Sequence, residues 1–220
     1  MSPPERILFF VDVSAEMGRE QLKPSGMTRI NVTKNLLKRF IWLKSSFSRN
    51  HEYGIVELGS CANWHTPFTN DICSIISALD SLQCHEDDFE SMEADSILET
   101  ILQAQPDIPN PPTAPSLRAI IIYGRSDVVP SQPDPEQLAN LRANPCIFID
   151  AIYLHGSVRT YGPVIQQIFD RISEFELRED MYMFELSQRS ATYGISMARL
   201  LAHPLQRVKK QADAFPVLSN

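Results

Sequence analysis

Three nearly unbroken apolar runs set the strongest limit on what this chain can fold into. They span residues 6–13 (RILFFVDV), 117–124 (LRAIIIYG) and 145–154 (PCIFIDAIYL). Such runs are typical of strands in a parallel sheet, where helices cover both faces. Residues 28–47 separate two strands with helical spacing, which places Ile30, Leu37, Phe40, Ile41 and Leu43 on one face. The chain therefore predicts an α/β domain.

The remaining patterns complete this alternation. Two short strands at 53–58 and 62–66 form a predicted hairpin, and a last strand is expected at 181–186. Further helices are predicted at 72–82 after a cap at Asn70, at 92–102, from Asp134, at 163–172 and at 191–201. The result is a three-layer, Rossmann-like fold with a mostly parallel six-stranded sheet, one antiparallel edge strand and helices on both faces. We expect one domain over residues 1–203 and a C-terminal tail over 204–220.

Composition excludes several classes of function. The 220 residues hold 20 Lys and Arg against 27 Asp and Glu, a net charge of −7, so nucleic acid is not an expected partner. No apolar run approaches the ~18 residues of a membrane span, so no membrane partner is expected. The cysteines, which lack CxxC spacing, are expected to be buried free thiols (Cys61, Cys73, Cys84 and Cys146). No GxSxG, P-loop or HExxH motif is present, so we expect no enzyme, no catalytic residue and no cofactor.

Oxygen-bearing side chains follow the first strand at Asp12, Ser14 and Glu16. This segment resembles the Asp-x-Ser-x-Ser motif of von Willebrand factor A domains, and that resemblance implies a Mg²⁺ cradle completed by an Asp after the fourth strand. Here Glu16 replaces the second Ser, and Arg125 stands where the acidic loop would be. A divalent ion about 5 Å from a guanidinium would be repelled by roughly 6 kcal/mol at an effective dielectric near 20. We therefore expect a degenerate, metal-free site in which Arg125 pairs with Asp12 or Glu16.

The C-terminal segment alternates apolar and basic residues in a way that leaves two interpretations open. It suits docking on a partner, and equally it suits packing back on the domain. The candidate partner-binding residues lie at its start and near its end: Leu201, His203, Pro204, Leu205, Gln206, Arg207 and Phe215.

The string LLAHPLQR at 200–207 gives a more specific resemblance. It is similar to the C-terminal signature of the von Willebrand A-like scaffold subunits of the BRISC and BRCA-A deubiquitinase complexes. The strand ending Tyr123-Gly124-Arg125 and the strand leading to His155 are also similar to that family.

This resemblance implies a non-catalytic scaffold that assembles a deubiquitinase complex acting on non-degradative polyubiquitin, in DNA-damage and receptor signalling. It also implies a location in cytoplasm and nucleus. The implied direct partner is the subunit built from ubiquitin-conjugating-variant domains, called brain and reproductive organ-expressed protein. The metalloprotease deubiquitinase and its MPN-like scaffold partner would belong to the same complex.

Two other functions compete with the scaffold role. One is a Mg²⁺-dependent ligand-binding module, and the other is a von Willebrand A ubiquitin receptor. If the tail docks in trans, Arg207→Ala should weaken co-purification with the partner and leave the thermal midpoint of the domain nearly unchanged.

Overall fold

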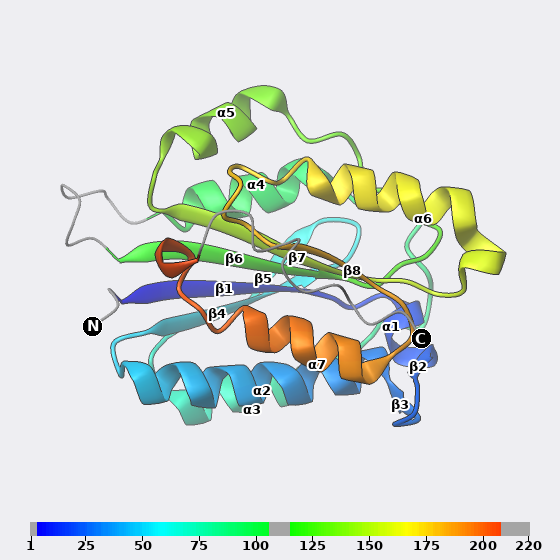
Figure 1. Cartoon of the computed structure of the whole chain (residues 1–220), viewed down its shortest axis with the longest axis horizontal. Coiled ribbons are helices and arrows are strands. Elements are labelled where there is room, and N and C mark those ends of the chain that lie inside the picture. Colours follow the sequence, from blue (N-terminus) through cyan, green and yellow to red (C-terminus); the bar gives the residue numbers. More distant parts are fainter. Residues whose placement is uncertain (1–3, 106–114, 208–220) are drawn as a thin grey trace.

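The computed structural model describes residues 4–105 and 115–207 (Figure 1). A six-stranded sheet in the order β5-β4-β1-β6-β7-β8 forms its centre. Neighbouring strands are parallel except β5, which pairs antiparallel with β4 at one edge. The predicted sheet is therefore confirmed. Its strands are β1 (Glu5–Asp12), β4 (Glu52–Leu58), β5 (Ala62–Thr69), β6 (Ser116–Tyr123), β7 (Ile147–Leu154) and β8 (Met183–Leu186).

Helices cover the sheet in two layers (Figure 1). One layer holds α2 (Arg29–Phe47), α3 (Ile72–Ser81) and α7 (Ser190–Arg199). The other holds α4 (Ala94–Gln103), α5 (Pro135–Ala143) and α6 (Val158–Ser173). Within the described ranges, no helix has both the length and the apolar character that a membrane span requires.

Alternation along β1 explains why both layers are needed. Leu8 and Phe10 belong to the core under α4, α5 and α6, whereas Ile7, Phe9 and Val11 belong to the core under α2 and α7. All five side chains are fully buried. Burial of an apolar side chain of this size contributes about 1.5–3 kcal/mol, so the central strand holds the two layers together.

The strand order reverses beside β1, which pairs with β4 on one side and β6 on the other. The carboxyl ends of β1 and β6 therefore lie together, where ligand sites of open α/β sheets are found. Gly124 follows β6 at this edge. A Cβ there would come within 2.1 Å of the Met17 sulfur, so any other residue would force the buried Met17 side chain to move.

Small elements between β1 and α2 were not predicted from the sequence. They are α1 (Ala15–Arg19) and a two-stranded ribbon of β2 (Gln21–Leu22) and β3 (Met27–Thr28). Pro204–Gln206 form a further 3-10 turn. These elements have two to five residues, too few for periodicity to show them.

Four local predictions need correction. Helix α6 starts at Val158 rather than at 163, because Ser157 caps it and Pro163 lies inside it. The cap of α3 is Asp71, not Asn70. Leu43, expected in the core, is 48% exposed. All four cysteines are free, as expected, but none is fully buried and Cys73 is exposed.

Candidate functional site

The first candidate site lies where β1 and β6 reach their carboxyl ends, which we call the carboxyl edge of the sheet. Asp12 ends the central strand β1 there. One Asp12 carboxylate oxygen accepts the Ser14 backbone N–H at 2.9 Å, and the other accepts the Gly124 N–H at 2.8 Å. Asp12 is fully buried. Its backbone partners come from the two loops that follow β1 and β6, so this carboxylate joins the two strand ends.

Arg125 completes the neutralisation of Asp12. Its Nε lies 3.2 Å from Oδ1 and 3.3 Å from Oδ2, so of the two predicted pairings, with Asp12 or with Glu16, Arg125 adopts the one with Asp12. The guanidinium also donates to the Leu58, Gly59 and Ser91 carbonyl oxygens at 2.9, 2.6 and 3.1 Å. Its Nε and both terminal nitrogens therefore bond within the chain, and the charge lies 2% exposed.

An aromatic ring covers the outer side of this guanidinium. The Phe89 centroid lies 4.9 Å from the Arg125 Cζ atom. A cation over an aromatic face gains about 0.5–2 kcal/mol, more when it is desolvated. Phe89 belongs to the acid-rich segment after α3, and sequence analysis did not assign it to the site.

Glu16 pairs with a different arginine. Its Oε1 accepts from Arg29 Nη1 at 2.7 Å and from the Ser126 hydroxyl, and its Oε2 accepts the Ser126 N–H at 2.8 Å. Arg29, which begins α2 and is fully buried, also donates to the Gly124 carbonyl at 2.8 Å. Sequence patterns did not assign Arg29 or Ser126 to the site, since Arg29 lies at the start of a predicted helix and Ser126 in the loop after a predicted strand.

These oxygens do not fit the divalent cation that the family motif implies. Both Asp12 oxygens and both Glu16 oxygens already accept hydrogen bonds, and two buried guanidiniums balance the two carboxylates. A hard cation needs about six oxygens and little nearby positive charge. The site therefore links the carboxyl ends of β1 and β6.

The second candidate site lies at the opposite, amino edge of the sheet and centres on Asp150 of β7. Arg207 grips this carboxylate with both terminal nitrogens, at 2.6 Å to Oδ1 and 2.9 Å to Oδ2. Arg118 of β6 donates from Nε to Oδ2 at 2.8 Å. Burial alone would raise the pKa of Asp150, but the two guanidiniums hold it below its usual value. The carboxylate is therefore ionised and doubly paired.

The rest of Arg207 is also held by the domain. It donates to the Asp180 carbonyl at 2.9 Å, and its guanidinium lies 4.0 Å from the Tyr182 ring centroid. Only 8% of Arg207 is exposed. Its truncation should therefore lower the free energy of unfolding, which corrects the expectation that the thermal midpoint would not change.

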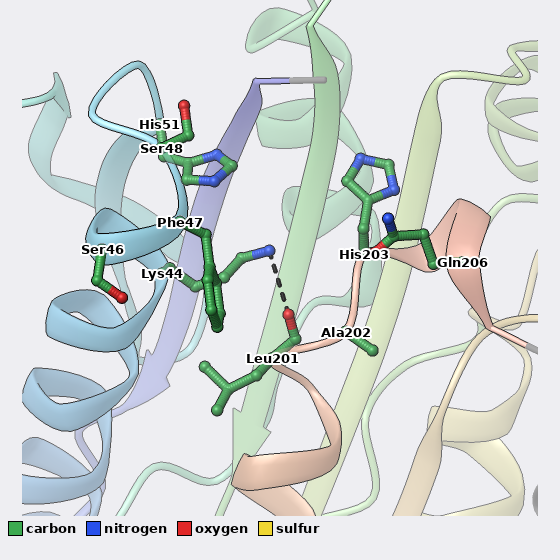
Figure 2. Close-up of a pocket in the computed structure, with 9 residues that line it drawn as sticks. All are labelled: Lys44, Ser46, Phe47, Ser48, His51, Leu201, Ala202, His203 and Gln206. Atoms are coloured by element: carbon green, nitrogen blue, oxygen red, sulfur yellow. Dashed lines mark hydrogen bonds between the residues drawn. The ribbon is translucent and has the colours of Figure 1, made fainter. Parts of the chain in front are cut away.

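A second ion pair at this edge joins Glu5 of β1 to Lys44 of α2. Lys44 Nζ also donates to the Leu201 carbonyl at 3.3 Å (Figure 2). Burial lowers the pKa of Lys44, against the attraction of Glu5. The strand, the helix and the C-terminal segment thus meet at one buried charge cluster.

His203 anchors the same segment. Its Nδ1 accepts the Leu205 N–H at 3.1 Å, and its Nε2 lies 3.3 Å from the Ser116 hydroxyl at the start of β6. His51 accepts the Glu5 N–H at Nδ1, at 2.9 Å. Burial lowers the pKa of both His51 and His203. Both bonds need an unprotonated Nδ1, so the neutral rings suit this edge.

The predicted partner-binding residues thus divide between buried anchors and exposed positions. His203, Pro204 and Arg207 are buried, Leu201 is half-buried, and Leu205 and Gln206 are exposed. Phe215 lies outside the described residues. The packed chain runs to Arg207, past the boundary predicted at residue 203. Pro204 and Arg207 thus pack on the domain in the free chain, and docking on a partner stays a prediction.

Known proteins can be compared with this chain by sequence and by fold. No family model matches the chain. It is 27% identical over 229 residues to "BRISC and BRCA1-A complex member 1" of Xenopus laevis, covering 98% of this chain and 68% of that protein. The protein of the same name from Homo sapiens is 23% identical, over 98% of this chain and 68% of its own length.

Solved structures are similar at the level of the fold. The SpRpn10 VWA domain has a TM-score of 0.60 and 15% identity, over 93% of this chain and 98% of that one. Proximal thread matrix protein 1 from the mussel byssus has a TM-score of 0.63 and 11% identity, over 90% and 47%. The predicted von Willebrand A-like fold is confirmed. Across nearly its whole length the chain is similar, at 22–27% identity, to proteins called BRISC and BRCA1-A complex member 1.

Proposed function

We propose that this chain is a non-catalytic scaffold subunit of a deubiquitinase complex of the BRISC or BRCA1-A type. The observation that carries the proposal is the Arg125 guanidinium on Asp12, which takes the place of a divalent ion at the strand ends. A site held by internal ion pairs keeps its shape without metal and offers no open ligand position. The names of the relatives add the assembly role.

The direct partner under this proposal is the subunit built from ubiquitin-conjugating-variant domains. The metalloprotease and its MPN-like scaffold partner would act in the same complex on non-degradative polyubiquitin, in cytoplasm and nucleus. The chain itself would supply rigidity and a docking surface.

The segment at 204–207 is built to present such a surface. Pro204 and Arg207 are buried at its two ends, while Leu205 between them is 65% exposed. An apolar side chain held outward by fixed neighbours loses little conformational entropy when it docks. Leu205 and Gln206 are therefore the contacts we assign to the partner, and Arg207 acts by holding them in place.

Substitution of Leu205 tests this assignment. Leu205→Asp should reduce co-purification with the ubiquitin-conjugating-variant subunit at least tenfold, since an apolar contact becomes a desolvated charge. The thermal midpoint should stay within about 2 °C, because the side chain is exposed in the free chain. Val158→Asp on α6 is the matched control, since Val158 is also an exposed apolar side chain, at 60%.

Equal recovery of the partner with Leu205→Asp and with Val158→Asp would remove the docking assignment. Failure of the unsubstituted chain to co-purify with that subunit would remove the scaffold proposal as a whole.

A further inference from the structure

The last two turns of α2 carry an exposed apolar cluster that the scaffold proposal does not use. Trp42 is 56% exposed, Leu43 48% and Phe47 67%. Leu43 lines a hollow with residues of α7, whereas Trp42 and Phe47 line a hollow with the start of α3. Large apolar side chains grouped on a surface mark a binding site more often than chance exposure.

Three hollows adjoin this cluster, and one of them lies between the end of α2 and the start of α3, where Trp42, Phe47, Arg49 and Asp71 are among its lining residues. The other two lie toward α7 and the C-terminal segment. The first of these two, which we call the α2–α7 groove, measures about 200 Å³ and is lined by Leu36, Arg39, Phe40, Leu43, Gly194, Met197, Ala198 and Leu201. The second, the terminal pocket, measures about 520 Å³ and is lined by Lys44, Ser46, Phe47, Ser48, His51, Leu201, Ala202, His203 and Gln206 (Figure 2). Leu201 lines both, so the groove and the pocket adjoin at this residue.

The charge of this face is opposite to that of the protein. Neither the α2–α7 groove nor the terminal pocket is lined by an Asp or Glu, although the whole chain carries a net charge of −7. Arg39 lines the groove, and Arg49 lies beside Trp42 and Phe47. Both arginines are exposed and form no ion pair within the described residues. Asp71 lines the same hollow as Arg49, where it caps α3.

The carboxyl end of α2 does not reverse this balance. A helix C-terminus carries partial negative charge on its free carbonyls. Here the Lys44 carbonyl accepts the Ser48 N–H, and the Leu43 carbonyl accepts the Ser46 hydroxyl. Beneath the pocket, Lys44, Arg118 and Arg207 outnumber Glu5 and Asp150. The face remains apolar and cationic.

We propose that this face binds an acidic amphipathic helix of a partner protein. Apolar side chains spaced at one helical turn would enter the α2–α7 groove and the terminal pocket, and carboxylates beside them would pair with Arg39 and Arg49. The inference goes beyond the scaffold proposal, because it rests on α2 and α7 and does not involve Leu205.

Charge argues against two other occupants. Residues 208–220 carry Lys209 and Lys210 against Asp213, so this part of the chain does not complement a cationic face. A second copy would bring the same face against itself across a two-fold axis and place Arg39 and Arg49 near their equivalents.

Trp42 provides a direct reporter of binding. The chain has one other tryptophan, Trp64 on β5, which a Trp64→Phe variant removes. The probes are two synthetic helical peptides of about 14 residues, roughly 21 Å long, with identical Leu and Phe positions. One carries Glu and the other Lys at the remaining positions. The Glu peptide should shift Trp42 emission to shorter wavelength and bind at least tenfold more tightly than the Lys peptide.

Charge reversal on the protein sharpens the test. The double variant Arg39→Glu, Arg49→Glu should reverse the preference between the peptides, while Arg159→Glu on the opposite helical layer should leave it unchanged. Phe47→Ser should weaken binding of the Glu peptide with an unchanged thermal midpoint, because Phe47 is exposed.

Three results would overturn the proposal. The first is no binding, or equal binding of both peptides irrespective of Arg39 and Arg49. The second is a Trp42 shift with protein concentration alone, which would identify a second copy as the occupant. The third is a Trp42 shift on removal of residues 208–220, which would identify that segment.

Discussion

Buried ion pairs stabilise both the carboxyl edge and the amino edge of the sheet, where its strands end and begin, but the two clusters are assembled differently. At the carboxyl edge, Asp12 is shared by two backbone N–H groups and Arg125, whose other donors reach backbone carbonyls. At the amino edge, Asp150 accepts one backbone N–H, from Tyr182, and pairs with two arginines, Arg118 and Arg207. The carboxyl edge therefore has one arginine on Asp12 and two backbone N–H groups, whereas the amino edge has two arginines on Asp150 and one backbone N–H.

The largest effect is expected for a substitution at the centre of the amino edge. Asp150→Ala leaves two buried guanidiniums without their shared carboxylate and should cost about 3–5 kcal/mol of the free energy of unfolding. Asp12→Ala at the other edge should cost about 1–3 kcal/mol, because Arg125 keeps its carbonyl acceptors. Urea denaturation of both variants measures the difference. Equal losses would show that the two edges do not differ in this way.

Histidines at the amino edge give a smaller, pH-dependent effect. Burial lowers the pKa of His51 and His203 in the folded chain, whereas in the unfolded chain each titrates near 6.5. The unfolded state therefore binds more protons below pH 6.5. Stability should be constant above that pH and fall below it, by up to about 1.4 kcal/mol per pH unit for each histidine.

Urea titrations between pH 7.5 and 5 measure this slope. The double variant His51→Gln, His203→Gln should flatten it, since glutamine can accept the same N–H groups without titrating. An unchanged slope in that variant would assign the pH dependence to other groups.

The smallest expected effect concerns the carboxyl edge. If Arg125 replaces the ion, millimolar Mg²⁺ and EDTA should leave the thermal midpoint unchanged, since only a ligand of the folded state raises it. The variant Arg125→Ala removes the guanidinium and tests whether the cradle then responds to Mg²⁺. A midpoint that rises with Mg²⁺ in the unsubstituted chain would favour the metal-dependent module.

Sequence patterns predicted the strands and the carboxyl edge, but not the amino edge. The pairing of Arg125 with Asp12 could be foreseen because both residues end adjacent predicted strands. The partners of Asp150 come from β6 and from 57 residues further along the chain, so spacing gives no clue to them. One signal was present. Arg118 and Asp150 are charged residues inside buried strands, and such charges require a partner.

Exposed residues on α2 show a different limit. Helical periodicity placed Leu43 in the core, because apolar spacing cannot distinguish a face buried in the domain from one left on the surface. Which face is covered depends on how α7 crosses α2, and that is a property of the tertiary fold. Leu43, which was wrongly predicted to be in the core, lies on the surface where we propose that a partner helix binds.

The dependence of Asp150 on Arg207 has a consequence for synthesis on the ribosome. β1, β6 and β7 are all translated before the second arginine of the amino edge leaves the exit tunnel. Until then, Asp150 has only Arg118 and the Tyr182 N–H as partners within the described residues, and the Tyr182 ring lacks the Arg207 cation. The nascent domain therefore cannot complete this ion-pair cluster until Arg207, the last described residue, emerges. Leu205 reaches its exposed position in the folded chain only at that point.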